Sequence, residues 1–358
     1  LKDKMQREGG DVFLVSNLKN IRYLCGFTGS SGFLAVTEHG THFFSDGRYR
    51  TQAADEVIGA EVRIYGTAGD FTDMLKTVVQ ATTDKVAYES AHTTVVRGQM
   101  GAFGSGKDDI EKCFPDHELV QTKGWVEALR RLKEPAEIDL IRTAAQMADE
   151  GFSYIVDQVV PGKTEHELAL DLEFHMRSLG ADDVSFEPIV AAAERSALPH
   201  AHPTQREVEK GRFLLFDLGC IYKGYCSDLT RTIVIGPLDD RHREIYDLVA
   251  ASEQAGLDAI RPGVMARDAD RAARDVIEAA GHKDAFGHGL GHGVGIEIHE
   301  EPRLGGQSED VLEQGHVVTC EPGAYFAGWG GVRVEDLLLV TDQGNEVLSH
   351  SSKELIVL

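Results

Sequence analysis

Two segments decide the fold: PGKTEHELALDLEFHMRSLG (residues 161–180) and PGVMARDADRAARDVIEAAG (residues 262–281). Both open with Pro-Gly and close with Gly, so three positions recur at an offset of 101 residues, 262 minus 161. Each reads as a helix, because Thr164 and Glu167 make a capping box in the first and the closing glycine of each suits a helix C-terminus. Chance coincidence of the three positions is the alternative. The recurrence predicts a duplicated helix-helix-strand unit with pseudo-twofold symmetry, whose halves can build one site together.

The chain changes character near residue 123. Before that point, β-branched or aromatic runs alternate with helical stretches; the runs are DVFLVS (11–16), GFLAVT (32–37), THFFSD (41–46) and DKVAYES (84–90). After Pro135, apolar residues fall at helical spacing, namely Ile138, Ile141, Ala145, Ala148, Phe152 and Ile155. We therefore predict an α/β (α+β) protein, with a small mixed α/β domain over residues 1–122 and a pseudo-twofold domain over residues 123–358.

The first helical pair is followed by two acid-bearing strands, FLLFDLG (213–219) and YCSDLTRT (225–232). If Lys223-Gly224 is the turn between them, Tyr222 faces Tyr225 and Asp217 faces Thr230. Alternation then puts Asp217 and Asp228 on one face as diagonal neighbours, within reach of a shared ion. A salt bridge or a turn cap is the alternative reading for each aspartate. A carboxylate among Phe and Leu is costly unless a cation or partner offsets it, which favours a metal site.

The second half repeats this theme in VVTCEPGAY (317–325) and GGVRVEDLLLVT (330–341). Glu321 ends an apolar strand. Arg333 and Glu335 are predicted to share one face of a single strand, whose other face carries valines. Four acids thus come from two matching regions, and oxygen-rich sites of this kind suit Mn, Co, Zn or Mg.

Imidazoles are supplied by FGHGLGHGVGIEIHEEP (286–302), which holds His288, His292 and His299. Its alternating glycines make a helix improbable, so this is not a helical zinc motif; close approach of backbone explains the glycines better. Packed or exposed histidines are the alternative, but three within twelve positions predict a site. His200, with its less specific neighbour His202, precedes the first acidic strand.

Length, charge and cysteine content limit the class of protein. A chain of 358 residues is longer than one core usually supports. The formal net charge of -23 argues against nonspecific binding to nucleic acid. The sequence contains no run of about 18 apolar residues, so a membrane span is not predicted. The five cysteines are scattered without a C-x-x-C pair, which favours a reducing, cytoplasmic compartment. The chain begins at Leu1 without a secretory signal segment, and residues before it can have been removed.

Several motifs, in this order, resemble those of the pita-bread metallopeptidases, specifically the aminopeptidase P and prolidase branch. They are the Asp217/Asp228 hairpin, the run from His288 to Glu300, the E-P-G at 321–323 and the V-R-V-E-D at 332–336. NIRYLCGFTGSSG (20–32) and FFSDGRYRTQA (43–53) look like the N-terminal domain of that branch. The resemblance covers nearly the whole chain. It implies a creatinase/prolidase-like N-terminal domain followed by a pita-bread catalytic domain.

The resemblance also implies two divalent metal ions per chain, with manganese expected and zinc or cobalt as alternatives. The ligand positions match Asp217, Asp228, His292, Glu321 and Glu335, of which Asp228 and Glu335 bridge the two ions. It places His200 and His299 at the substrate carbonyl and the developing oxyanion. Arg333 and Tyr325 match a polar network beside the metals, and His288 is assigned to the pocket wall.

Two neighbouring cations lower the pKa of a bridging water and polarise the scissile carbonyl, so a hydroxide bridging the metals can attack at neutral pH. Glu321 can receive the proton, and His299 or His200 can donate a hydrogen bond to the oxyanion. The resemblance implies cleavage before proline and a homodimer. We therefore expect an Xaa-Pro aminopeptidase, which releases the N-terminal residue from peptides with proline in second position.

Prolidase, restricted to Xaa-Pro dipeptides, is the close alternative. The aminopeptidase is preferred because the stretch from Glu321 to Leu358 has no evident inserted loop that would exclude longer peptides. Methionine aminopeptidases usually lack the N-terminal domain, and inactive binding modules or metal-free creatine-degrading relatives lack the ligand set present here. The GFTGSSG loop (26–32) has no Lys-Ser/Thr ending, so an ordinary turn is favoured over a phosphate-binding loop.

Overall fold

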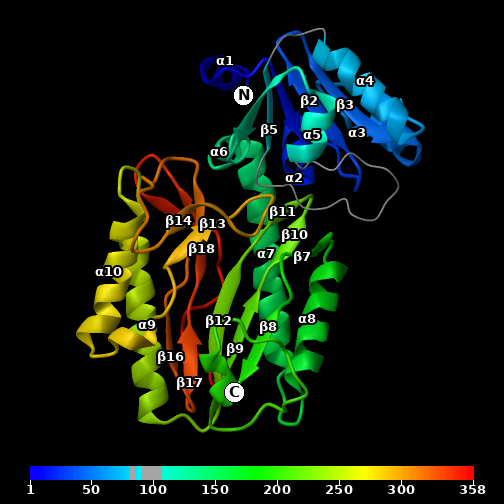
Figure 1. Cartoon of the computed structure of the whole chain (residues 1–358). Helices are drawn as coiled ribbons and strands as arrows, with labels where there is room; N and C mark the ends of the chain where they lie inside the picture. Colours follow the sequence, from blue (N-terminus) through cyan, green and yellow to red (C-terminus); the bar gives the residue numbers. More distant parts are fainter. Residues whose placement is uncertain (81–84, 90–106) are drawn as a thin grey trace. The chain divides into compact units, whose positions relative to one another are not determined.

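The computed structural model describes residues 1–80, 85–89 and 107–358. The chain divides into two compact units, Leu1–Arg130 (unit 1) and Arg131–Leu358 (unit 2), each with its own hydrophobic core (Figure 1). Within the described ranges, no helix combines the length and the apolar character needed to cross a membrane.

Unit 1 is built on a six-stranded mixed sheet in the order β4-β3-β2-β1-β5-β6. Its strands are β1 (Val12–Val15), β2 (Phe33–Thr37), β3 (Thr41–Asp46), β4 (Glu61–Tyr65), β5 (Lys85–Glu89) and β6 (Glu118–Thr122). Its α-helices are α1 (Lys2–Glu8), α2 (Leu18–Cys25), α3 (Arg50–Glu56), α4 (Ala68–Gln80), α5 (Lys107–Cys113) and α6 (Glu127–Arg130). The run predicted over 84–90 forms β5, and its first and last residues lie outside the described part of the chain.

Both faces of this sheet are buried. Along β1, Phe13 and Val15 pack into one core cluster with Trp125, whereas Val12 and Leu14 pack into a second cluster. Successive side chains of a strand point to opposite faces, so an unbroken apolar strand such as VFLV requires cover on both sides. Unit 1 is therefore a layered α/β domain, as predicted.

The helices of unit 2 show the predicted duplication. They are α7 (Pro135–Gln158), α8 (Glu165–Ser178), α9 (Asp240–Ala259) and α10 (Ala266–Ala279). The bounds of α8 and α10 differ by 101 at both ends (266 minus 165, 279 minus 178), and α7 and α9 end at the same offset (259 minus 158). Gly180 and Gly281, which follow α8 and α10, both adopt positive φ, 107° and 86°. Figure 1 shows α7 and α8 on one side of the unit 2 strands and α9 and α10 on the other.

Between the helix pairs lie four sheets, in the orders β12-β9-β8, β11-β10-β7, β14-β13-β15-β18-β19 and β16-β17. In the first half the strands are β7 (Asp183–Val184), β8 (Ile189–Ala192), β9 (Arg212–Leu218), β10 (Cys220–Tyr222), β11 (Tyr225–Cys226) and β12 (Leu229–Ile235). In the second half they are β13 (Gly291–Gly293), β14 (Glu300–Leu304), β15 (Val317–Cys320), β16 (Gly323–Phe326), β17 (Gly330–Arg333), β18 (Asp336–Val340) and β19 (Asn345–Val347). Each half thus supplies its own strands to the middle of the unit.

The first acid-bearing hairpin has the predicted register. Tyr222 pairs with Tyr225, and Asp217 pairs with Thr230. The turn residues Lys223-Gly224 have φ values of 46° and 83°. Positive φ at both central positions is what a two-residue type I′ turn requires, so the turn fixes the register.

The stretch 330–341 differs from the single strand that the sequence predicts. It is divided into β17 and β18, which belong to different sheets. Glu335 lies in the break because its N–H donates to the carbonyl of Thr230 (3.1 Å), while the guanidinium of Arg231 donates to the carbonyl of Glu335. The backbone of the first half therefore captures this segment of the second half and turns it out of the strand.

The capping box of α8 leads to a stability prediction. Thr164 Oγ1 accepts from the N–H of Glu167 (3.1 Å), and the Glu167 carboxylate accepts from the N–H of Thr164 (2.8 Å). Thr164→Ala should lower the free energy of unfolding by about 1 kcal/mol, because a first-turn N–H loses its acceptor. Thermal melting measures the change, with Thr143→Ala inside α7 as the control, expected to stay within about 0.5 kcal/mol. Equal losses in both variants would contradict the capping role.

Candidate metal centre

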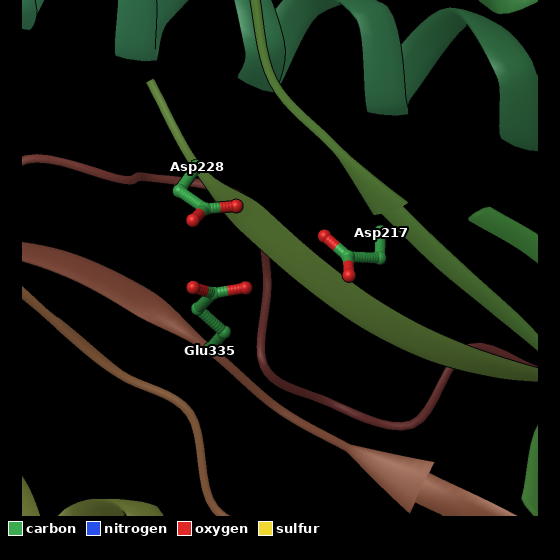
Figure 2. A group of neighbouring side chains, drawn as sticks. All are labelled: Asp217, Asp228 and Glu335. Atoms are coloured by element: carbon green, nitrogen blue, oxygen red, sulfur yellow. The ribbon is translucent and has the colours of Figure 1, made fainter. Parts of the chain in front are cut away.

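Three carboxylates meet where strands of the two halves adjoin. Asp217 lies near the end of β9, Asp228 precedes β12, and Glu335 precedes β18. Each offers an oxygen within 4.8 Å of the others, and Figure 2 shows the three groups turned toward a common space. Carboxylate oxygens at this spacing could hold a divalent cation between them.

Glu321 and His292 extend this cluster on the side of the second half. Glu321 directly follows β15, and His292 is the central residue of β13. His292 Nε2 lies 3.4 Å from Glu321 Oε1 and 3.6 Å from Asp228 Oδ2. The fold thus brings together all five side chains that the sequence nominates as metal ligands.

The pKa values of these groups reflect burial of like charges. Burial, followed by the charges of Glu335, Asp217 and Glu321, raises the pKa of Asp228 well above its ordinary value. Burial likewise raises the pKa of Glu335 well above its usual range and that of Glu321 to about 7. Burial lowers the pKa of His292 to about 3, so the imidazole is neutral and its nitrogen is available to a metal.

Two buried carboxylate oxygens in the cluster indicate whether the site suits a cation. Within the described part of the chain, Asp217 Oδ1 and Glu335 Oε1 are buried without a hydrogen-bond partner. A buried carboxylate oxygen without a donor is costly, and a divalent cation would offset that cost. Four carboxylates and one imidazole form a donor set that fits two divalent metal ions.

Two threonines outside the set of residues predicted from the sequence hold the acids in place. Thr230 Oγ1 donates to Glu335 Oε2 (2.6 Å). Thr319 Oγ1 donates to Glu321 Oε1 (3.3 Å) and accepts from the N–H of His292 (3.1 Å). Thr230 lies two residues after Asp228 and Thr319 two before Glu321, so strand alternation was the signal that could have found both.

A chain of hydrogen bonds leads away from Asp217. Arg333 Nη2 donates to Asp217 Oδ2 (2.5 Å), and Arg333 Nη1 donates to the Tyr325 hydroxyl (2.9 Å). That hydroxyl lies 2.9 Å from His288 Nε2. His288, assigned from the sequence to the pocket wall, is therefore joined to the acidic cluster through Tyr325 and Arg333.

His200 and His299 both have exposed side chains near the cluster. The rings of His299 and His292 lie edge to face, with centroids 4.4 Å apart. His200 follows Pro199, whose carbonyl accepts from Arg333 (3.4 Å). His202, the less specific candidate, instead contacts Glu187 (2.5 Å). Two imidazoles thus remain accessible beside the five candidate ligands.

The glycines around His292 are required by close approach of backbone, as predicted. A Cβ atom at Gly291 would lie 2.1 Å from the Thr319 carbonyl oxygen, and one at Gly293 would lie 2.4 Å from that of Glu301. Both distances are far below van der Waals contact. The glycines therefore let β13 approach its neighbours closely enough to bring His292 to the acids.

Two family models match the chain. Residues 139–342 match the model of metallopeptidase family M24, and residues 1–132 match that of the creatinase/prolidase N-terminal domain. The first match spans more than half of the 358 residues and contains all five nominated ligands.

Relatives are similar over both units. A solved structure of an Xaa-Pro dipeptidase from Bacillus anthracis has a TM-score of 0.93 and 39% identity, covering 100% of this chain and 98% of that one. The Xaa-Pro dipeptidase of Pyrococcus furiosus is 40% identical over 270 residues, 75% of this chain and 78% of the relative. The structure of an X-Pro aminopeptidase from Thermotoga maritima has a TM-score of 0.89 and 33% identity, covering 99% and 100% of the two chains.

Proposed function

The chain belongs to metallopeptidase family M24, and on that premise we propose that it is an Xaa-Pro dipeptidase with two divalent metal ions. The observation that carries the proposal is the convergence of Asp217, Asp228, His292, Glu321 and Glu335 from both halves of unit 2. We assign Asp217, Asp228 and Glu335 to the shared acidic side of the metal pair. His292 and Glu321 complete the ligand set on the other side.

When bound, the two cations supply the acidity that makes a water molecule nucleophilic at neutral pH, and they polarise the scissile carbonyl. Glu321 is the residue to which we assign the proton of that water, because its carboxylate lies in the cluster, 3.4 Å from His292 Nε2, and a carboxylate can serve as a general base. His299 and His200 are the exposed donors that we assign to the substrate carbonyl and the developing oxyanion. The hydrogen bond from Arg333 to Asp217 holds that carboxylate in one orientation.

The substrate assignment rests on the relatives. The sequence favours an Xaa-Pro aminopeptidase, but the relatives named as Xaa-Pro dipeptidases give the alternative more support. The aminopeptidase remains the second candidate, because a structure with that name is similar over 99% of this chain. A proline at the cleaved bond forms a tertiary amide without an N–H, so it requires no acceptor there.

Three finer properties belong to the same proposal. We assign manganese as the native metal, since four carboxylates and one imidazole suit it, with zinc and cobalt as alternatives. We assign a homodimer on the family resemblance, which light scattering coupled to gel filtration tests. We assign a cytoplasmic location on the five free cysteines.

The experiment compares substrates of two lengths. Manganese-loaded protein is given Ala-Pro and Ala-Pro-Pro-Ala, and the released alanine is measured by mass spectrometry. We expect kcat/KM to be at least about tenfold higher for the dipeptide, because a dipeptidase site recognises the free carboxylate of proline. Ala-Ala, which lacks the proline ring, is the matched control and should be cleaved far more slowly. A preference for the tetrapeptide would establish the aminopeptidase instead, and failure with both proline substrates would reject the proposed function.

A further inference from the structure

The turn that carries His288 lies outside regular secondary structure. Residues 286–290 belong to neither a helix nor a strand, and Gly287 and Gly289 flank the histidine. Glycine has more conformational freedom than any other residue, so such a turn holds one shape only when side chains outside it bind its backbone. Three of its residues are held by one ion pair on α10.

That ion pair is Asp270–Arg274. Arg274 donates to Asp270 through Nε (3.0 Å) and Nη2 (2.8 Å). It also donates through Nη1 to the carbonyl of Phe286 (2.8 Å) and through Nη2 to the carbonyl of His288 (2.7 Å). Asp270, which is 1% exposed, accepts from the N–H of Leu290 (3.0 Å). Every second residue of the turn is therefore bound by this pair.

The guanidinium is itself fixed in place. Its central carbon lies 4.1 Å from the centroid of the Phe286 ring, a cation–π contact that adds to the bidentate bond with Asp270. A planar guanidinium held on two sides has one orientation, and in that orientation it reaches two carbonyls at once. A lysine ammonium at this position would lack the planar fork of donors that reaches Asp270 and both carbonyls together.

The turn connects to the metal centre by two routes. His288 Nδ1 lies 2.8 Å from the carbonyl of Gly289, so Nδ1 carries the proton and Nε2 accepts from the Tyr325 hydroxyl. From Tyr325 the bonds continue to Arg333 and Asp217. Along the second route, the carbonyl of Leu290 accepts from the N–H of Glu321 (2.8 Å).

We propose that Asp270 and Arg274 are positioning residues that hold the His288 turn in the geometry required for hydrolysis. The inference deepens the proposed function and rests on it. The two residues act through the backbone of residues 286–290, which sets the His288 ring against Tyr325 and the peptide of Leu290 against Glu321. A shift of about 1 Å in such a supporting segment is enough to cost on the order of a hundredfold in rate.

The first half of unit 2 contains a comparable arrangement, which supports this reading. Glu165, at the start of α8, is 0% exposed and pairs with Arg195 (3.0 Å). It accepts from the N–H of Ala192 (2.7 Å) and from the N–H of Thr204 (2.9 Å). One carboxylate thus closes both ends of the segment that carries His200, so each half holds a histidine-bearing segment with a buried acid–arginine pair.

The test is a double-mutant cycle between Arg274 and His288. We expect Arg274→Met to lower kcat/KM for Ala-Pro by about 10- to 100-fold, mainly through kcat, while Arg274→Lys retains an intermediate value. In a His288→Ala background, Arg274→Met should lower kcat/KM by a severalfold smaller factor than in the wild-type background, because the route through the ring is missing and only the route through Leu290 and Glu321 remains. Additive losses would overturn the proposal, since they would mean that Arg274 acts on the substrate directly or only on folding.

Arg271 provides the matched control on the same helix. Its side chain is 58% exposed and pairs with Glu278 (3.3 Å) on the surface. Arg271→Met should leave kcat/KM within about twofold of the wild-type value. An equal loss in Arg271→Met and Arg274→Met would assign the effect to α10 as a whole and would overturn the proposal.

A second readout separates this inference from the proposed function. In zinc-loaded protein labelled with 15N-histidine, long-range proton–nitrogen spectra report the tautomer of His288, whose signal is identified by its absence in His288→Ala. We expect the Nδ1-protonated form in the wild type and in Arg271→Met, and a changed signal in Arg274→Met. An unchanged signal in Arg274→Met would overturn the inference even if the enzyme cleaves Ala-Pro. Failure of the wild type to cleave any Xaa-Pro substrate would reject the proposed function and leave this readout intact.

Discussion

Asp228→Asn is expected to lower kcat/KM for Ala-Pro on the order of a thousandfold, the largest effect of any single substitution considered. Asp228 lies among the other ligands, with its Oδ2 3.6 Å from His292 Nε2 and its carboxylate grouped with those of Asp217 and Glu335. The amide keeps the shape of the side chain but removes a negative charge that would hold the bound cations. Steady-state kinetics of manganese-loaded protein measure the loss.

The metal content of the same variant provides an independent measurement. We expect the bound manganese to fall from two ions to one or fewer per chain, measured by mass spectrometry of the dialysed protein. The metal-free variant should be at least as stable as the metal-free wild type, because the substitution removes one of several buried like charges. Asp258→Asn on the exposed face of α9 is the control, expected to change neither quantity. Two bound ions and full activity in Asp228→Asn would contradict the ligand assignment.

Local sequence signals predicted most of the elements that build the centre. The recurrence of Pro-Gly and Gly predicted α8 and α10 because capping residues act within a few positions of a helix end. The register that pairs Asp217 with Thr230 followed from a turn at Lys223-Gly224, since the side-chain period of a strand is two residues. The same register would have nominated Thr230 as a support for the acids.

Contacts between distant segments were beyond local patterns. The break between β17 and β18 arises because Arg231 donates to the carbonyl of Glu335 and pairs with Asp336 (2.6 Å), residues more than 100 positions away. A strand is predicted from the alternation of side chains between its two faces. Arg333 and Glu335 fit that alternation, so the sequence contained no sign of the break. Asp270 and Arg274 are spaced i and i+4, as an ordinary surface ion pair also is, so their spacing gives no sign of the turn at 286–290 that they bind.

The two halves of unit 2 also explain why the five proposed ligands meet at one point. Asp217 lies near the end of β9 and Glu321 directly follows β15, while Asp228 and Glu335 directly precede β12 and β18. The corresponding acids are 104 and 107 residues apart (321 minus 217, 335 minus 228), close to the offset of the helices. A duplicated unit thus supplies two acids from each half, and His292 from the second half breaks the symmetry.

The stability gained from manganese should rise steeply between pH 6.5 and pH 8.5. Burial raises the pKa of Glu321 to about 7 and raises the pKa values of Asp228 and Glu335 well above their ordinary range in the metal-free protein. A folded-state pKa above the unfolded value means that the folded protein binds more protons in the interval between them. Stability of the metal-free protein is therefore lost as pH rises through that interval.

The histidines limit the pH range in which the metal-free protein is expected to lose stability as pH rises. Burial lowers the pKa of His292 to about 3 and that of His288 to about 4, so below about pH 6.5 their loss of protons on folding opposes the carboxylates. An unfolded histidine is about half protonated at pH 6.5, so the opposing contribution of both histidines fades between about pH 6.5 and pH 7.5, and above that range the carboxylates dominate. Burial also raises the pKa of Glu253 to about 8, but this residue is not among the proposed ligands. Its contribution to stability is the same in metal-free and metal-loaded protein and cancels in their difference.

Metal binding removes the repulsion among the carboxylates, because cations replace the protons that the metal-free site retains. For Glu321 alone, a shift from 4.5 to about 7 corresponds to about 3 kcal/mol on full deprotonation, of which only about 1 kcal/mol is lost above pH 6.5. The main change above pH 6.5 is therefore expected from Asp228 and Glu335, whose pKa values are raised further. Melting temperatures with and without manganese, measured at pH 6.5, 7.5 and 8.5, should therefore diverge as pH rises. In Asp228→Asn, the rise in melting temperature on adding manganese should be smaller and should depend less on pH. If the rise in melting temperature that manganese gives the wild type stays constant or shrinks as pH rises, these carboxylates do not bind the metal.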